Sequence, residues 1–467
     1  MKANKVIKRT TTYLAPHRAG WRVIHNFRPL RGLAAFLALS WLAGPGLAWA
    51  QPAGGILTEK AAIEMALRQH PSVRESQEKA EASRELIGVS QAPYFPQVSF
   101  GYNYFFGTAF SRSTGGSPQS FSPPGVASSL NQQASNFFTQ RFSVSQLIYD
   151  FGKTSGNVAS SRATYHQSRE DYATTRATVV LNARTAFFGY LAAIRALKVT
   201  QETVRQNQEL LKQAQGFYQV GIRAKIDVTK AEANLYDAES NLIKARNLVD
   251  VSRITLMNAL GLKSWPFSDL EDIMEVTHQP RPLGDLREQA LARRPEVLKN
   301  RYQLEANQAS LKVARAGYYP TLSSSASYGW QGERYPLQEQ WWVGLGVTFP
   351  LFEGFTTTHS VRSAKATIRA TTAGGETLRQ DIVKEVEQSY LDLRAAWELI
   401  RATAKALEAA RENFRLAQGR YKVGVGSIIE VTDAQVQLFQ ADLKHVQALY
   451  DHRVAEAKLD KAVGEAY

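Results

Sequence analysis

The stretch AQGRYKVGVGSIIEVTDAQ at 417–435 nearly repeats the stretch AQGFYQVGIRAKIDVTKAE at 214–232. Each interrupts a long run rich in Ala, Leu, Gln, Glu, Lys and Arg, residues that favour helices. Each places a glycine, Gly221 or Gly424, at the interruption, and a fresh apolar rhythm follows. One chain therefore breaks two long helices at the same phrase, which points to a repeated architecture.

The repetition extends well beyond this phrase. At an offset of 224 residues, ALRQHPSV (66–73) recurs as ALARRPEV (290–297), and APYFPQVSFGYNY (92–104) falls on AGYYPTLSSSASY (316–328). Downstream the offset is 203, which relates IYDFG (148–152) to LFEGF (351–355) and the two opening phrases to each other.

The change in offset places an insertion in the first copy. It falls in the Ser-, Gly- and Pro-rich segment 111–136, which we interpret as an enlarged exposed loop. We therefore expect an internal tandem duplication, with a first structural repeat at 51–282, which ends in a Pro-rich linker, and a second at 283–467.

Each half shows the same order of elements: a helix, two strands, a long helix, the break and a second long helix. The first helices are expected over about 58–91 and 284–316. Alternating apolar or aromatic and small or polar residues predict strands in QVSFGYNYF (97–105), RFSVSQLIY (141–149), TLSSSASYGW (321–330) and WWVGLGVTF (341–349). This alternation is typical of membrane barrel strands, although half-buried strands of soluble proteins share the period.

The long helical runs need a partner along their whole length. Residues 153–215 and 356–418 contain no proline and would each extend about 95 Å as helix. Large residues recur every seven positions, with small residues three positions later, which predicts helices packed along a supercoiled seam. In the second half the large residues are Val386, Leu393, Ile400, Leu407, Phe414 and Tyr421. A plain coiled coil or a soluble bundle has the same period.

The N-terminus has the pattern of an export signal. The first fifty residues hold eight Lys or Arg and no acid, out of a net charge of +14 for the chain. The apolar run 32–44 and the sequence Ala48-Trp49-Ala50 then predict a signal peptide over 1–50, cleaved before Gln51. An uncut membrane anchor is the alternative. After residue 50 no basic patch with interleaved aromatics favours a nucleic-acid partner.

The sequence offers little for catalysis. It has no cysteine, which excludes disulfides and thiol chemistry. His445 and His452 lie seven residues apart without a third ligand at a fitting spacing. We expect no catalytic residues, no cofactor, no metal site and no enzyme activity.

The strand starts YFP and YYP, the strand exits IYDFG and PLFEG, the two breaks and the duplication together resemble TolC-type outer-membrane efflux proteins. The resemblance covers nearly all of 51–467. It implies a mixed α+β membrane protein, a homotrimer in which each protomer gives four strands to a shared 12-stranded β-barrel in outer-membrane lipid. The long paired helices would form an α-barrel through the periplasm.

The implied function is the outer-membrane exit channel of a tripartite efflux or secretion system. Such a channel is a passive conduit for small molecules or polypeptides. An inner-membrane transporter drives it, and a periplasmic adaptor protein connects the two. The alternative is a periplasmic coiled-coil structural or adaptor protein, which needs no membrane-facing aromatic strands. An envelope-processing enzyme would need a convergent polar pocket, for which the sequence gives no sign.

The resemblance also assigns roles to the repeated phrase, as a helix-to-helix turn at the periplasmic end of the tube. Val220-Gly221 and Val423-Gly424 match the tip motif that docks onto the adaptor. The acidic positions of the gate fall on Glu430 and Asp433, and its companion links on Tyr421 and Asp227.

Two positions depart from the family pattern. Gly426 stands where the family usually has an arginine, and Ile226 stands where it has a polar partner. Arg223 and Lys225, in the first tip, are the cations available to replace the missing link. Because the second tip carries Asp433 where the first has Lys230, we expect the second hairpin to form the gate.

Overall fold

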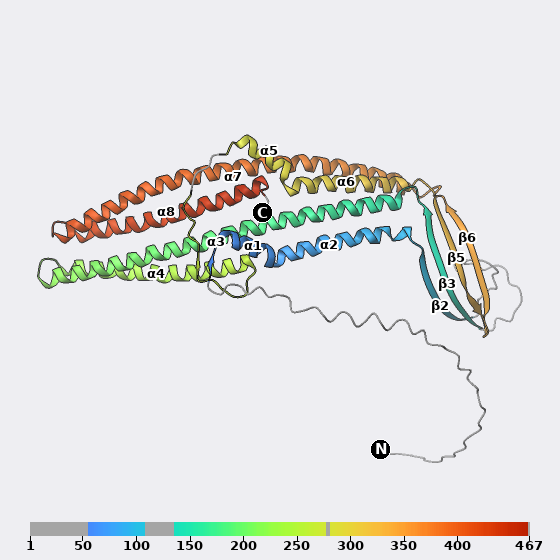
Figure 1. The fold of residues 1–467 in the computed structure, drawn as a ribbon, viewed down its shortest axis with the longest axis horizontal. Coiled ribbons are helices and arrows are strands. Elements are labelled where there is room, and N and C mark those ends of the chain that lie inside the picture. The colour runs from blue at the N-terminus through green and yellow to red at the C-terminus, as the bar shows by residue number, and fades with distance from the viewer. Residues whose placement is uncertain (1–54, 108–134, 277–280, 466–467) are drawn as a thin grey trace, which may run out of the picture. The chain divides into compact units, whose positions relative to one another are not determined.

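A computed structural model of the chain describes residues 55–107, 135–276 and 281–465. From Gly54 onward the chain forms one compact unit, in which long helices run side by side and lead to a four-stranded sheet (Figure 1). The predicted signal peptide and most of the predicted loop at 111–136 lie outside the described residues.

The sheet consists of the four predicted strands, in the order β2-β3-β5-β6, all antiparallel. Their bounds are Gln97–Gly107 (β2), Ser135–Tyr149 (β3), Thr321–Gly332 (β5) and Gln338–Thr348 (β6). β3 begins six residues before the predicted start, so Ser135 and Asn136 belong to a strand and not to the loop. In register, Phe100 faces Phe142, and Phe142 faces Tyr328.

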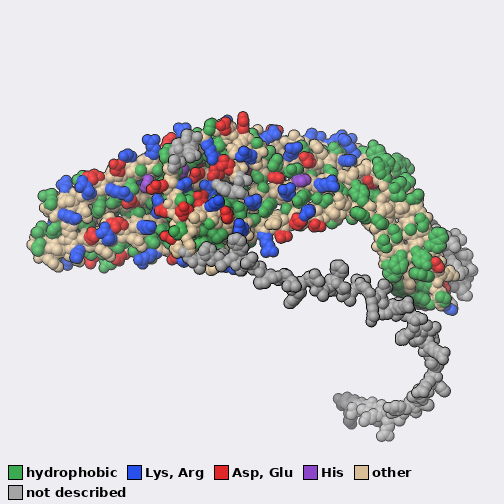
Figure 2. All heavy atoms as spheres, viewed as in Figure 1, with side chains coloured by type: hydrophobic (Ala, Val, Ile, Leu, Met, Phe, Trp, Pro, Cys, Tyr) green, Lys and Arg blue, Asp and Glu red, His purple; other side chains and the backbone are tan. Residues whose placement is uncertain are grey.

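No helix covers this sheet within the described residues. Apolar side chains gather over the strands, whereas charged side chains are spread over the helices (Figure 2). Large apolar residues of β2 and β6 are more than half exposed, namely Val98, Phe100, Tyr102, Tyr104, Phe106, Trp341, Val343, Leu345 and Val347. Among the described residues, β2 and β6 each pair on one side only, so both edges of the sheet are open there.

Two residues with positive φ mark each passage from a strand to a long helix. In the first half they are Phe151 (φ 53°) and Gly152 (φ 94°), and in the second Gly354 (φ 59°) and Phe355 (φ 65°). The order of phenylalanine and glycine is reversed between the halves, yet in both halves two consecutive residues have the left-handed backbone conformation. A phenylalanine in this region costs about 1–2 kcal/mol, so each junction carries local strain.

The predicted first helix of each half is wrong in one respect, because each is broken in two. α1 (Glu59–Gln69) ends before α2 (Pro71–Gln91), and α5 (Leu283–Arg293) ends before α6 (Pro295–Ala316). Proline lacks the amide hydrogen and forces the preceding residue into extended backbone. His70 and Arg294 accordingly have ψ angles of 126° and 129°.

The long helices reach one turn beyond their predicted ends. α3 (Lys153–Gln219) and α7 (Thr356–Lys422) each have 67 residues, about 100 Å. α4 (Lys225–Leu260) and α8 (Ile428–Val463) each have 36 and pack against α3 and α7. By length and composition alone α3 could cross a membrane, but its apolar residues Phe187, Phe188 and Leu191 are buried in the protein.

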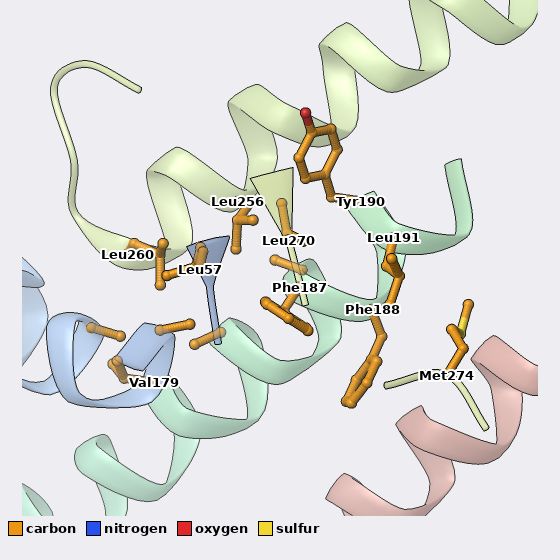
Figure 3. Close-up of a cluster of buried hydrophobic side chains, with 14 of the residues drawn as sticks. Leu57, Val179, Phe187, Phe188, Tyr190, Leu191, Leu256, Leu260, Leu270 and Met274 are labelled. Atoms are coloured by element: carbon orange, nitrogen blue, oxygen red, sulfur yellow. The ribbon is translucent and has the colours of Figure 1, made fainter. Parts of the chain in front are cut away.

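The main core lies halfway along α3 (Figure 3). The Phe187 and Phe188 rings are fully buried and meet edge to face at 5.5 Å. Around them pack Leu57 of β1 (Ile56–Leu57) and Leu270 of β4 (Asp269–Leu270), which pair in parallel. β4, which follows α4, is thereby fixed against α3.

A buried ion cluster lies in the same region of α3. Arg184 donates from Nε to Glu59 Oε1 of α1 and from Nη1 to Asp460 Oδ2 of α8, both at 2.7 Å. Only 7% of the Arg184 side chain is exposed. The guanidinium, on α3, thus connects the first α-helix of the described chain, α1, with the last, α8.

Candidate functional site

Both copies of the repeated phrase form tight turns between antiparallel helices. Residues 220–224 join α3 to α4, and residues 423–427 join α7 to α8. The backbone hydrogen bonds correspond one by one, for example Gly221 N to Tyr218 O (3.0 Å) and Gly424 N to Tyr421 O (3.1 Å). We call these two turns, with the last helical turn before and the first after each, the hairpin tips.

Each turn needs glycine because of its backbone conformation, and not because a side chain would lack space. Gly221 has φ 73° and Gly424 has φ 82°, values that L side chains rarely adopt. Apart from the neighbouring residues in the chain, no atom of the described residues lies within 4 Å of where a Cβ would be at either position. The space around both glycines is therefore open.

Apolar side chains project from the ends of the hairpins. Val220 is 68% exposed and Val423 is 74% exposed. Ile222 and Val425, on the other side of each glycine, are also exposed. Each tip therefore presents two branched apolar side chains around an open backbone, with nothing in the described residues covering them.

Tyr421 lies at the centre of the contact between the two tips. It is fully buried, and its ring meets that of Phe217 edge to face at 5.6 Å. Its hydroxyl has no hydrogen-bond partner among the described residues. Burial raises the pKa of Tyr421, and the nearby carboxylate of Asp227 raises it further, while Arg223 lowers it. Asp227 thus acts on the Tyr421 hydroxyl through its charge, without a hydrogen bond between them.

The two acidic gate positions lie one turn apart on α8. Glu430 and Asp433 are both exposed, and the spacing of three places them on neighbouring positions of one helix face. Arg420 Nε is 3.7 Å from Glu430 Oε2, a solvent-exposed pair of the kind that contributes little to stability. Asp433 makes no ion pair within the described part of the chain.

The sequence singles out two cations of the first tip, and the structure separates them. Arg223 points across to the second tip and donates to the carbonyl oxygens of Gly424 and Gly426. Lys225 begins α4 and is exposed. Sequence reasoning could not identify the acceptors of Arg223, because backbone carbonyls leave no mark in a residue pattern. It also missed Phe217, whose partner Tyr421 is 204 positions away.

Gly426 packs directly against the chain before it. A Cβ on Gly426 would lie 2.9 Å from the Tyr421 amide nitrogen and 3.0 Å from the Arg420 carbonyl carbon. An arginine, the residue that the family pattern leads one to expect, therefore requires a turn of different shape.

Replacing Gly426 with alanine is expected to destabilise the second tip by about 1–3 kcal/mol, because backbone atoms must move to admit the methyl group. Amide hydrogen exchange in peptides covering 419–430 should become faster. The matched control is Gly419→Ala, a helical position with open space, where alanine should slow exchange. Equal protection in wild type and the Gly426→Ala variant would contradict the packing argument.

No group of three or more His, Asp or Glu side chains in the described residues is arranged to hold a metal ion. His445 instead pairs through Nδ1 with Thr403 Oγ1 at 3.2 Å. The ring of His452 packs against that of Trp397.

Comparison with known proteins agrees with this architecture. The family described as outer membrane efflux protein matches residues 62–262 and 286–465, and the chain belongs to this family. The outer membrane protein TolC of Escherichia coli (strain K12) is 24% identical over 416 residues, covering 86% of this chain and 81% of that protein. Protein CyaE of Bordetella pertussis is 24% identical over 459 residues, covering 93% and 90%.

Solved structures share the fold. The outer-membrane channel OprN superposes with a TM-score of 0.73 at 20% identity, covering 87% of this chain and 89% of that chain. CusC, whose structures were described in connection with transmembrane channel formation, gives a TM-score of 0.74 at 18% identity, covering 89% and 95%.

Proposed function

We propose that the protein is the exit channel of a tripartite export system, located in the cell outer membrane and extending into the periplasm. The observation that carries the proposal is the uncovered four-stranded sheet with two open edges. In a bilayer every backbone polar group needs a partner, so an open sheet edge is not tolerated there. Four strands are too few to close a barrel, and sharing among identical chains removes the edges.

Three copies give a 12-stranded barrel with the aromatic residues facing lipid. The long helices then line a common tube below it, with the hairpin tips at its far end. The names of matched relatives, among them an efflux pump outer membrane protein of Pseudomonas putida, support an adaptor and an inner-membrane transporter as partners. They describe channel and transport proteins and not enzymes.

The proposal includes the two repeats and the signal peptide. Equal lengths of α3 and α7, and of α4 and α8, support a tandem duplication with repeats at 51–282 and 283–467. Export by a signal peptide over 1–50 is consistent with a location in the outer membrane.

Outer-membrane fractionation and gel migration test the assembly. The protein should fractionate with outer membranes and migrate as a trimer that heating converts to monomer. A soluble periplasmic monomer would contradict the channel and favour the coiled-coil structural or adaptor protein.

The gate residues have a separate test in planar bilayers. Around a threefold axis, Glu430 and Asp433 give two rings of carboxylates that attract cations. Replacing both with alanine should shift the reversal potential towards zero in a salt gradient and raise the conductance. The control variant Glu408→Ala/Glu412→Ala removes the same charge from exposed positions of α7. Currents like those of wild type after the Glu430 and Asp433 changes would remove these residues from the gate.

A further inference from the structure

The described part of the first tip makes its side-chain hydrogen bonds to the second tip through one residue. Arg223 Nη2 lies 2.9 Å from the carbonyl oxygen of Gly424 and 2.5 Å from that of Gly426. These acceptors are 201 and 203 positions away in sequence. A charge-assisted hydrogen bond is stronger than one between neutral groups. The two bonds of Arg223 therefore link the hairpins more strongly than neutral hydrogen bonds would.

The surroundings of Arg223 hold its guanidinium in this direction. The group lies over the ring of Tyr421, with 5.6 Å between its central carbon and the ring centroid. Its Nε is buried and has no acceptor among the described residues. In the orientation that reaches the two carbonyls, Nε therefore makes no hydrogen bond. The attraction between the guanidinium and the face of the Tyr421 ring compensates in part for this lost hydrogen bond.

The two carbonyls converge only because of the shape of the second turn. Gly424 provides the left-handed step, and the missing side chain of Gly426 allows the turn to close on residues 420–421. A turn of another shape would aim these carbonyls elsewhere. The contact thus depends on the conformation of the turn and on the distance between the tips.

Below this contact the two hairpins share an apolar cluster. Its buried members come from both, namely Leu210, Ala214, Ala231, Ala417, Tyr421, Ile428, Val431 and Ala434. Any movement that separates one tip from the other must first break the bonds of Arg223 and then expose this cluster to water. The polar contact lies at the exposed end of the hairpins, beyond this cluster.

We propose that Arg223 is a positioning residue that holds the two tips of one protomer together and so keeps the entrance of the tube narrow. This inference rests on the proposed channel function. Here the cation comes from the first hairpin and binds backbone of the second.

Single-channel conductance in planar bilayers tests this role. Arg223→Gln should raise the ratio of protomers with separated tips to protomers with joined tips by about tenfold, as expected for loss of a charge-assisted hydrogen bond. Because separated tips widen the entrance, mean conductance should rise. Both bonds come from the single nitrogen Nη2 at the end of the arginine side chain. Arg223→Lys keeps the charge, but its shorter side chain does not bring the ammonium within reach of both carbonyls, so it should resemble Arg223→Gln. Lys225→Gln removes one charge two residues away and should behave as wild type.

Distances between spin labels provide a second measurement that does not depend on current. The chain has no cysteine, so labels can be placed on cysteines introduced at Ile226 and Ile429. These residues are equivalent in the two hairpins and are exposed. In trimers that contain mainly unlabelled protomers, Arg223→Gln should lengthen and broaden the distance distribution, and Lys225→Gln should not.

The outcomes separate this inference from the proposed function. Absence of any channel in wild type would overturn the function itself. Wild-type channels with unchanged conductance and label distance in Arg223→Gln would overturn the role of Arg223 alone. Full recovery by Arg223→Lys, together with an effect of Lys225→Gln, would show that only charge at the entrance matters and would also overturn the link.

Discussion

Replacing Arg184 with methionine is expected to lower the free energy of unfolding by about 3–5 kcal/mol, the cost of breaking a buried ion pair by removing one partner. Methionine keeps much of the volume but leaves the carboxylates of Glu59 and Asp460 without their shared cation. Both ion pairs have N–O distances of 2.7 Å, and the three side chains are largely buried. The expected loss is large because only 23% of the Glu59 side chain and 12% of the Asp460 side chain are exposed. Asp460 retains Arg281 Nη1 at 3.9 Å, a longer contact that compensates in part.

Unfolding by heat or denaturant, followed by far-ultraviolet circular dichroism in detergent, measures this loss. Arg205→Met is the matched control on the same helix. Arg205 is exposed and pairs with Glu202 and Glu209 in solvent, so its removal should change stability little. Equal stability of the two variants would show that the buried cluster does not hold the helices together.

The pH dependence of the Arg184→Met variant provides a further check. Burial raises the pKa of Asp460 above its ordinary value, although Arg184 opposes the rise through its hydrogen bond and charge. A carboxyl with a raised folded pKa favours folding most below its unfolded value of about 3.9 and loses that contribution as pH rises through the folded value. Because Arg184 lowers the pKa of Asp460, its removal raises that pKa further. The loss in free energy of unfolding caused by Arg184→Met should therefore be greatest at neutral pH and become smaller in acid.

The second large effect is expected at the ends of the hairpins. Val220→Asp/Val423→Asp should abolish export in cells and weaken adaptor binding by about tenfold or more, because a carboxylate desolvated in an apolar interface has no partner. Both side chains project into solvent in the protomer, so the fold should be retained. The variant should still form channels in bilayers, where no adaptor is present.

Val89→Asp is the control for this substitution. Val89 lies on α2 and is 67% exposed, nearly the same fraction as Val220. Pull-down with the cognate adaptor and susceptibility of cells to an exported compound provide the measurements, compared with the single variant Val220→Asp. Retained adaptor binding in the double variant would rule out docking through these valines.

The sequence was sufficient to predict the strands, the long helices and the position of both turns. Those features come from periodicity over many residues and from glycines whose conformation no other residue adopts easily. The breaks before Pro71 and Pro295 were visible in the quoted repeats, but a continuous apolar rhythm hid them. The start of β3 was misplaced because polar residues at its beginning look like loop.

The tip contacts were harder to predict than the elements. Val220, Gly221, Val423 and Gly424 lie in turns, as their positions in the repeated phrase predict. Their role in docking stays a prediction, as does the role of Glu430 and Asp433 in the gate. The direction of Arg223 depends on where two carbonyls of a distant turn point, and only a three-dimensional arrangement determines that.

The equal lengths of the paired helices have a consequence for how such a chain can change. α3 matches α7 at 67 residues, and α4 matches α8 at 36. Four residues inserted into one hairpin arm would move its tip by about 6 Å, which takes Arg223 out of reach of its acceptors. An insertion that keeps this contact therefore has to change all four arms by the same length, and in the proposed tube the length of these helices would set its depth.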